Sequence, residues 1–221
     1  MSVRKQTYFE GWEKAIHATN ARLTAEQERL VLKAFNDSMA DLIKKISKSR
    51  AGFIPSKIYR DYAYDLYRTL DSIIGDYSRK VIEETLDAQM YVILKSLGAE
   101  GNATASLYES GIRQATAVYS RQVAELVAKG NLYKDGVGLS SRIWKVSNAA
   151  GRTIQEVVQQ GLSSGQSAVD MAKLLEEFVK PKARRFWDNA KIESILGKTT
   201  ARKFENLDYN ALRLARTTIS H

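Results

Sequence analysis

The sequence predicts an all-α protein, and three observations lead to this fold class. Apolar residues recur every three or four positions through most of the 221 residues, which is the period of a helix with one buried face. Only two prolines occur, Pro55 and Pro181, and each stands where a helix can begin without losing a backbone hydrogen bond. No segment alternates apolar and polar residues long enough to favour a strand, although a sheet after residue 190 stays open.

The first predicted helix begins at Thr24 and ends before Gly52. Thr24 precedes Gln27 by three residues, the spacing of a capping box, in which two side chains satisfy the free backbone N–H groups at a helix start. Lys44 and Lys45 lie in its last turns, where positive charge complements the negative end of a helix. We expect this role for these lysines rather than a binding role.

A second helix is predicted from Pro55 to Leu97, because apolar residues keep helical spacing over that whole stretch. At about 1.5 Å per residue it spans on the order of 60 Å, more than the width of a typical compact domain. A further helix follows the glycine-containing break at 98–102 and continues to Gly130. The expected architecture is an elongated helical bundle with very long N-terminal helices.

The predicted domain boundary lies between Gly130 and Leu139, where three glycines fall in a stretch without helical period. This divides the chain into a long-helix bundle or stalk over residues 1–135 and a smaller helical C-terminal domain over 139–221. No internal repeat and no low-complexity tract is found.

The C-terminal part is predicted to contain at least three helices. The first begins at Leu139 and buries a stripe formed by Trp144, Ile154, Val157 and Val158. After a polar hinge over 161–167, a second helix begins with a capping box of Ser167 and Asp170. A third helix is expected to run from Leu207 toward the end of the sequence.

The composition narrows the class of protein. Cysteine is absent, which excludes disulfides and thiolate metal sites and argues against a secreted disulfide-rich scaffold. No run of about 18 apolar residues and no export signal are found, so we expect no membrane contact and an intracellular or virion setting.

Positive charge is concentrated at the two ends of the sequence. The net charge of +9 leaves the middle of the chain nearly neutral, whereas residues 180–221 carry 10 Lys and Arg against 4 Asp and Glu. Cations with interleaved aromatic residues near residue 185 form a candidate nucleic-acid patch: Lys180, Lys182, Arg184, Arg185, Phe186, Trp187 and Lys191. The alternative, which we favour on sequence grounds, makes Phe186 and Trp187 core residues and the cations a solvated face toward an acidic protein.

Candidates for catalysis are few. His17 and His221 are the only histidines, and no glycine-rich phosphate loop is present. Asp61 with Asp65, and Asp37 with Asp41, lie one helical turn apart, so each pair has the spacing to share a hard cation. We expect solvated helix faces instead, and we predict a protein that is not an enzyme and has no cofactor or metal.

The order of several short motifs resembles the phage head morphogenesis proteins, also called minor head or minor capsid proteins of tailed bacteriophages and prophages. The motifs are Leu139-Ser140-Ser141-Arg142-Ile143-Trp144, Gly161-Leu162, Gly165-Gln166-Ser167, Met171 to Leu175 and Ala211 to Thr217, with Ala215, Arg216 and Thr217 at the end. The resemblance covers roughly the last 80 residues.

The resemblance implies a structural protein of the head interior or portal vertex, made in the bacterial cytoplasm and acting in head assembly. Implied partners are the portal protein, other head proteins and, in some relatives, DNA. Separately, the predicted helix over 55–97 is longer than one small core, so a second copy of the chain or the portal stays open as the partner that covers its apolar stripe. Thr218 stands where such proteins commonly have Glu, and they usually continue beyond the position of His221, so the resemblance implies a short or truncated form.

Three hypotheses remain open after the sequence analysis: a phage head structural protein, a helical nucleic-acid-binding module, and an enzyme that uses only carboxylates.

Overall fold

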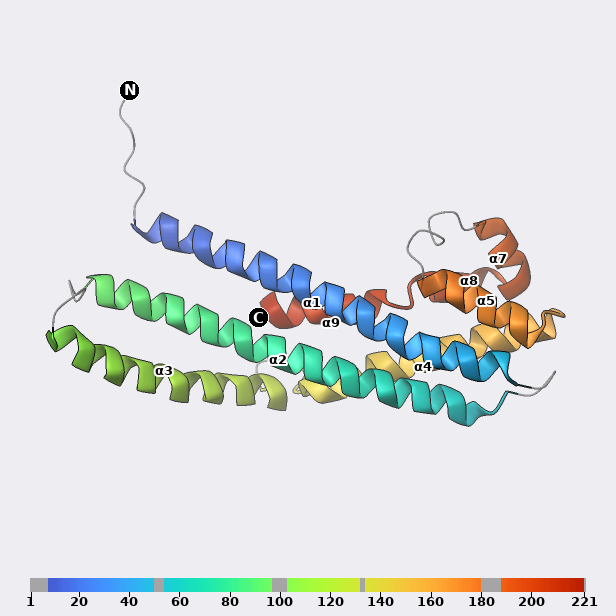
Figure 1. Ribbon diagram of the computed structural model, residues 1–221, viewed down its shortest axis with the longest axis horizontal. Helices are drawn as coiled ribbons and strands as arrows, with labels where there is room; N and C mark the ends of the chain where they lie inside the picture. Colours follow the sequence, from blue (N-terminus) through green and yellow to red (C-terminus); the bar gives the residue numbers. More distant parts are fainter. Residues whose placement is uncertain (1–7, 50–53, 97–102, 132–133, 180–187, 221) are drawn as a thin grey trace, which may run out of the picture. The chain divides into compact units, whose positions relative to one another are not determined.

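The computed structural model is all-α, as predicted (Figure 1). It describes residues 8–49, 54–96, 103–131, 134–179 and 188–220. Over these ranges the chain forms helices and no strand: α1 (Tyr8–Ser47), α2 (Ser56–Ser96), α3 (Ala103–Lys129), α4 (Leu139–Ser163), α5 (Ala168–Val179), α7 (Asn189–Leu196), α8 (Lys198–Glu205) and α9 (Tyr209–Ser220).

Helix α1 begins much earlier than the sequence predicted. Its 40 residues start at Tyr8, so Thr24 lies inside the helix and is not a cap. The Thr24 hydroxyl donates to the carbonyl of Asn20, one turn back, at 2.7 Å. Gln27 is fully buried, and neither polar atom of its side chain has a hydrogen-bond partner among the described residues. The predicted capping box at this position is therefore wrong.

Helix α2 confirms the predicted long helix almost to the residue. It covers 41 residues and follows directly on Pro55. Its apolar stripe is buried, as helical spacing required: Tyr59, Tyr62, Ala63, Leu66, Leu70, Ile74, Tyr77 and Val81. The predicted long N-terminal helices are thus present.

By packing, the chain divides into two compact units. Unit 1 takes residues 1–27, 74–139 and 216–221, and unit 2 takes residues 28–73 and 140–215. Helices α1 and α2 each contribute one part to unit 1 and one part to unit 2. This division follows different lines from the predicted domains 1–135 and 139–221, which stay a prediction.

Unit 2 contains most of the buried apolar side chains of the described residues. Ile143, Ile154 and Val157 of α4 are fully buried, and Phe178 of α5 stacks on Phe204 of α8 with ring centroids 4.9 Å apart. Burial of such side chains stabilises a fold by about 1.5–3 kcal/mol each. Unit 2 therefore has the core expected of an independently packed helical unit.

Helix α4 approaches the first part of α2 closely in unit 2. A Cβ added at Gly151 would lie 2.9 Å from the carbonyl oxygen of Tyr59 and 3.0 Å from the Cβ of Ala63. Real Cβ atoms are almost never this close to a backbone atom. Glycine at position 151 is therefore a condition for the two helices to pack.

Unit 1 is formed by the N-terminal part of α1, the second half of α2, and α3. Arg22 of α1 and Glu84 of α2 form an ion pair at 3.4 Å, and Arg79 of α2 and Arg121 of α3 line one surface cavity. Few of its described side chains are buried, and several apolar ones on α3 are exposed: Val118 by 55%, Tyr119 by 60% and Leu126 by 39%.

The turn between α4 and α5 confirms the second predicted capping box. Gly165 adopts a φ of 86°, which only glycine reaches without strain. The Ser167 hydroxyl accepts from the backbone N–H of Asp170 at 3.1 Å, and the Asp170 carboxylate accepts from the backbone N–H of Ser167 at 3.1 Å. The Ser167 hydroxyl also donates to the Asp170 carboxylate at 2.6 Å, and this bond, with the one from the Ser167 backbone N–H, lowers the pKa of the Asp170 carboxyl.

After residue 190 the described chain is helical, so the sheet that the sequence left open does not form there. Two helices of eight residues, α7 and α8, occupy the stretch instead and meet at Gly197, whose φ is 71°. Asp188 caps α7 by accepting from the backbone N–H of Lys191 at 3.2 Å.

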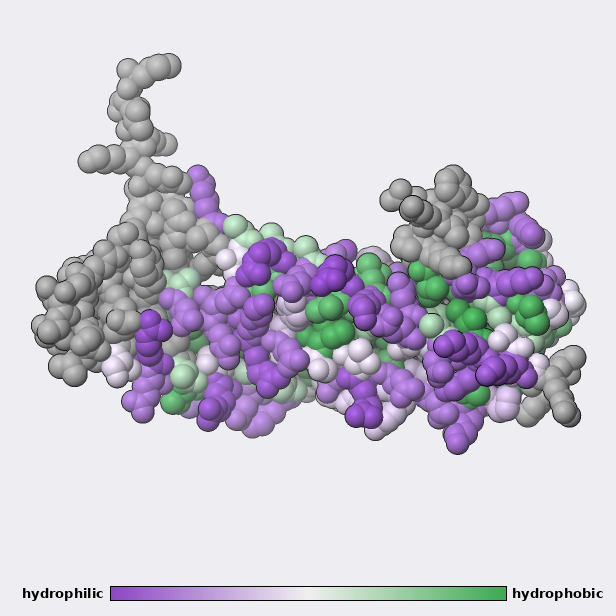
Figure 2. Space-filling view, viewed as in Figure 1, coloured by the Kyte–Doolittle hydropathy of each residue, from purple (hydrophilic) through white to green (hydrophobic). Residues whose placement is uncertain are grey.

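The described residues on the face drawn in Figure 2 are mostly hydrophilic. In Figure 2, hydrophobic side chains of the described residues reach the drawn face as separate patches between hydrophilic ones. None of the described helices combines the length and the apolarity needed to cross a membrane.

Candidate functional site

Most of the predicted nucleic-acid patch lies outside the described residues. This concerns Lys180, Lys182, Arg184, Arg185, Phe186 and Trp187. Lys191, the one described member, is exposed in the first turn of α7.

The surroundings of Lys191 do not favour a phosphate ligand. It lines a cavity of about 520 Å³ beside α5, together with Lys173. Three carboxylates line the same cavity: Asp170, Glu177 and Asp188. Because negative groups outnumber positive ones in this lining, an anion would gain little from binding there.

A second cavity in unit 2 has the opposite charge. It measures about 530 Å³ and lies between α4, α8 and the start of α9. We call it the basic cavity, and define it by its lining residues Val146, Ala149, Ala150, Thr153, Lys198, Thr199, Arg202, Lys203, Asn206, Leu207 and Asn210. Three of these residues are cationic and none is acidic.

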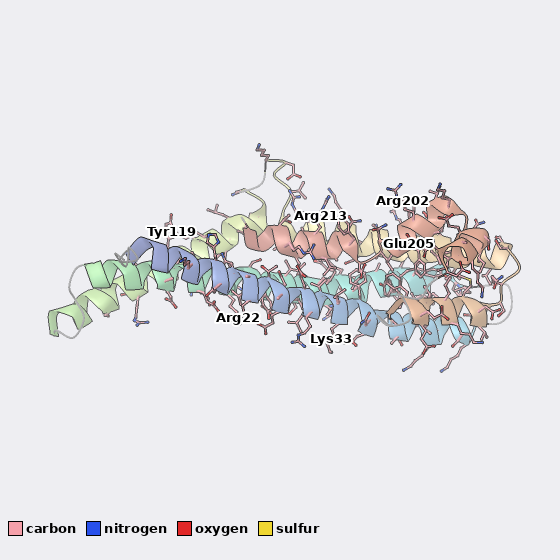
Figure 3. The ribbon with its side chains drawn as sticks, turned by 90° about the horizontal axis from the view of Figure 1, so that it is seen from above. Arg22, Lys33, Tyr119, Arg202, Glu205 and Arg213 are labelled. Atoms are coloured by element: carbon pink, nitrogen blue, oxygen red, sulfur yellow. The ribbon has the colours of Figure 1, made fainter. Side chains whose placement is uncertain are left out.

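The cations of the basic cavity are only partly neutralised. Lys203 of α8 donates to the Glu156 carboxylate of α4 at 2.8 Å. Within the part of the chain that the structure describes, Lys198 and Arg202 have no ion-pair partner. Figure 3 shows Arg202 on α8, with its side chain extending away from the ribbon. Two cations are therefore available to a ligand.

The first turn of α8 adds backbone donors at the same place. Its N-cap is Gly197, which has no side chain to accept from the free N–H groups, and the first turn carries no acidic residue. Lys198 and Thr199, which open this helix, both line the basic cavity. The positive end of the helix thus faces a lining that is already cationic.

The sequence alone does not predict this site. Lys198 and Arg202 are one helical turn apart, which is a usable signal only once residues 198–205 are known to be helical. The sequence also gives no hint that α8 packs beside α4.

Several residues of the family-like motifs hold α4 against α2. The Ser140 hydroxyl donates to Asp71 at 3.0 Å and lies 2.6 Å from the Tyr67 hydroxyl, which must then be the donor in that second bond. The ring of Tyr67 meets Trp144 edge-on, with centroids 5.5 Å apart. Arg142, which lies between Ser140 and Trp144 in the sequence, is half-buried. These contacts are structural in kind.

The sequence predicted that Trp144 belongs to the buried stripe of this helix, and this prediction is wrong. Its exposed fraction is 40%, because it covers the flank of Tyr67 at the edge of the core. The buried stripe is formed by Ile143, Ile154, Val157 and Val158 instead.

The remaining motif residues fall at turns and packing positions. A Cβ at Gly161 would lie 2.1 Å from the sulfur of Met171, so glycine lets α4 and α5 approach each other. Gly165 and Ser167 form the turn and the cap described above. Ala215 of α9 is fully buried, whereas Arg216 and Thr217 are exposed and each takes part in an interaction.

The carboxylate pairs proposed as candidate cation sites face lysines. Asp37 accepts from Lys33 at 2.8 Å, and Asp41 pairs with Lys45 at 2.6 Å. The hydrogen bond to Asp41 raises the pKa of Lys45, and Asp61 and Asp65 add to this effect. Over the described residues, no three His, Cys, Asp or Glu side chains gather as a metal site would require.

Comparison of the chain with protein-family models, with curated proteins and with solved structures gave no match.

Proposed function

We propose that the chain is a structural minor head protein of a tailed bacteriophage, acting in head assembly at the portal vertex. The proposal starts from the ordered resemblance of residues 139–217 to that family. The observation that supports it further is the role of these motif residues: Trp144, Gly161, Gly165, Ser167 and Ala215 serve helix packing, turns or caps.

That role is what a shared structural unit would require. Ser140 and Trp144 attach α4 to α2, Gly161 gives room to Met171, and Ser167 caps α5. Because such residues specify a packing arrangement rather than a reaction, a resemblance through them supports a common scaffold. A scaffold of packed helices fits a protein that works by binding other head proteins.

The test is co-expression of the full chain with the portal protein encoded beside it, followed by affinity purification and negative-stain imaging at low and high salt. We expect co-elution with a ring-shaped assembly that persists at high salt. A matched control replaces the portal with the major head protein from the same source. Failure to co-elute with the portal at either salt concentration would contradict the proposal.

A further inference from the structure

We infer that the basic cavity, with the adjoining face of α4, binds the phosphate backbone of nucleic acid. The inference goes beyond head assembly and does not depend on it. It also places the contact on residues other than 180–191, where the sequence placed it. Four observations support it.

The first observation is where the net charge lies. Unit 2 holds 22 Lys and Arg against 14 Asp and Glu, whereas unit 1 holds 12 against 11. Without Lys180, Lys182, Arg184 and Arg185, which belong to the patch predicted from the sequence, unit 2 still holds 18 Lys and Arg against 14 Asp and Glu, so most of the remaining excess lies in the unit that contains the basic cavity. A polyanion approaching the protein is attracted to this unit first.

The second observation is the kind of donor in the lining. Besides Lys198, Arg202 and Lys203, the basic cavity is lined by Thr153 and Thr199 hydroxyls and by the amides of Asn206 and Asn210. This mixture of cations, hydroxyls and amides is the set that contacts phosphate oxygens in protein–nucleic-acid complexes. Hot spots of protein–protein interfaces are enriched in buried Trp, Tyr and Arg side chains. The lining contains no aromatic residue.

The third observation is that the positive surface continues along α4. Lys145 and Arg152 precede and follow Ala149 by about one turn, so both flank the wall that α4 gives to the basic cavity. Both are exposed, and neither has an ion-pair partner within the described ranges. Residues 145–152 extend about 10 Å along the helix, which matches roughly three successive phosphates of one strand.

The fourth observation concerns the negative groups nearby. Glu156 is engaged by Lys203, Glu205 takes part in another interaction, and Asp208 is buried. Of the five described cations, only Lys203 is engaged by one of these carboxylates, and the first turn of α8, which has no side-chain cap, adds backbone donors to the same side. A phosphate near Thr199 would accept from this turn without displacing an acidic side chain.

The test measures binding of the full chain to a fluorescently labelled DNA duplex of mixed sequence by anisotropy over a series of salt concentrations. The Lys198→Ala/Arg202→Ala variant removes two cations from the basic cavity. We expect Kd to rise about tenfold at low salt and the slope of log Kd against log salt to fall by about two. The matched control, Lys57→Ala/Arg68→Ala, removes two exposed cations of α2 in the same unit, and we expect less than about a threefold change.

A second variant separates binding from folding. Thr199→Asp adds a carboxylate to the first turn of α8. Its negative charge interacts favourably with the helix dipole but repels phosphate. We expect an unchanged thermal midpoint by circular dichroism, together with loss of duplex binding. Equal weakening by the cavity and control variants, or binding by Thr199→Asp at the wild-type level, would overturn the inference.

Competition identifies the class of ligand. We expect inorganic polyphosphate to displace the duplex and polyglutamate of equal charge to displace it poorly. Displacement by polyglutamate at the same charge concentration would assign the site to acidic protein segments and overturn the nucleic-acid inference. Neither result bears on co-elution with the portal, so the two proposals fail separately.

Discussion

Helices α3 and α4 are nearly equal in length, 27 and 25 residues, yet α4 buries many more of its described side chains than α3 does. Six side chains of α4 are buried in unit 2, among them Ile143, Ile154 and Val157. Among the described side chains of α3 only Ser120 and Val127 are buried, and Tyr119 is 60% exposed. A helix of ordinary composition is marginal in water without packing. Stability should therefore be concentrated in unit 2, and α3 should open locally at a lower free energy.

The largest effect should come from the core of unit 2. Phe204→Ala removes a fully buried ring that stacks on Phe178, and we expect the free energy of unfolding to fall by about 3–5 kcal/mol. Tyr119→Ala on α3 should change it by less than about 0.5 kcal/mol. Urea unfolding followed by circular dichroism measures both. Similar losses in the two variants would refute the contrast between the units.

Alanine substitutions at two glycines test the same difference between α3 and α4. Gly151→Ala forces a Cβ against the backbone of α2, so we expect a loss of up to about 3 kcal/mol. Gly111→Ala on α3 meets nothing within 4 Å and should raise stability by up to about 1 kcal/mol through helix propensity. The two changes have the same chemistry and opposite expected signs, so thermal midpoints of the variants suffice. A destabilising Gly111→Ala would show that α3 packs more tightly than described.

The core of unit 2 also contains tyrosine hydroxyls that have no hydrogen-bond partner among the described residues. Burial raises the pKa of Tyr59 to about 12 and raises that of Tyr62 as well. The unfolded chain loses the Tyr59 proton near pH 10 and the folded chain does not, so stability should fall by about 2 kcal/mol between pH 10 and 12. Tyr59→Phe removes this part of the pH dependence. Because the Tyr59 hydroxyl has no partner among the described residues, the variant should be at least as stable at neutral pH.

Parallel pH titrations of chemical unfolding compare wild type with Tyr59→Phe, and the difference between the curves isolates Tyr59 from the lysines that titrate in the same range. Curves that stay parallel from pH 9 to about 12 would contradict the assignment.

The smallest effect concerns the ion pair of unit 1. Arg22 and Glu84 are 3.4 Å apart and exposed by 59% and 31%. A double-mutant cycle with Arg22→Ala and Glu84→Ala should give a coupling of about 0.2–1 kcal/mol that declines at high salt. A coupling that salt does not reduce would mean that unit 1 excludes water around this pair.

The bounds and the buried face of a helix could be predicted from the sequence only where the helix has many turns. Over the 41 residues of α2 the apolar period repeats often enough to fix both its bounds and its buried face. Helices α7 and α8 have eight residues each, too few turns to show a period, and they were missed. The cap predicted at Thr24 is wrong because capping residue types also occur inside helices, where the hydroxyl donates to a carbonyl of the preceding turn.

The candidate site was harder to predict than the fold. Periodicity showed which face of α4 is apolar, but it did not show that Trp144 is 40% exposed. The basic cavity joins residues near 150 to residues near 200, which are neighbours only through packing. The cations predicted to bind nucleic acid, between residues 180 and 191, are close together along the chain. The basic cavity instead brings cations of α8 beside α4 through packing.

Unit 2 is discontinuous, and this affects how the protein folds during synthesis. Its two segments, 28–73 and 140–215, are separated by the whole of α3 and part of α2. At about 5–20 residues per second, the ribosome needs roughly 5–18 s to complete α4 at Ser163 after residue 73 has been made. During that interval the stripe of Tyr62, Leu66 and Leu70 has no α4 to cover it. The nascent chain should therefore depend on chaperones more than a helical protein with only local contacts does.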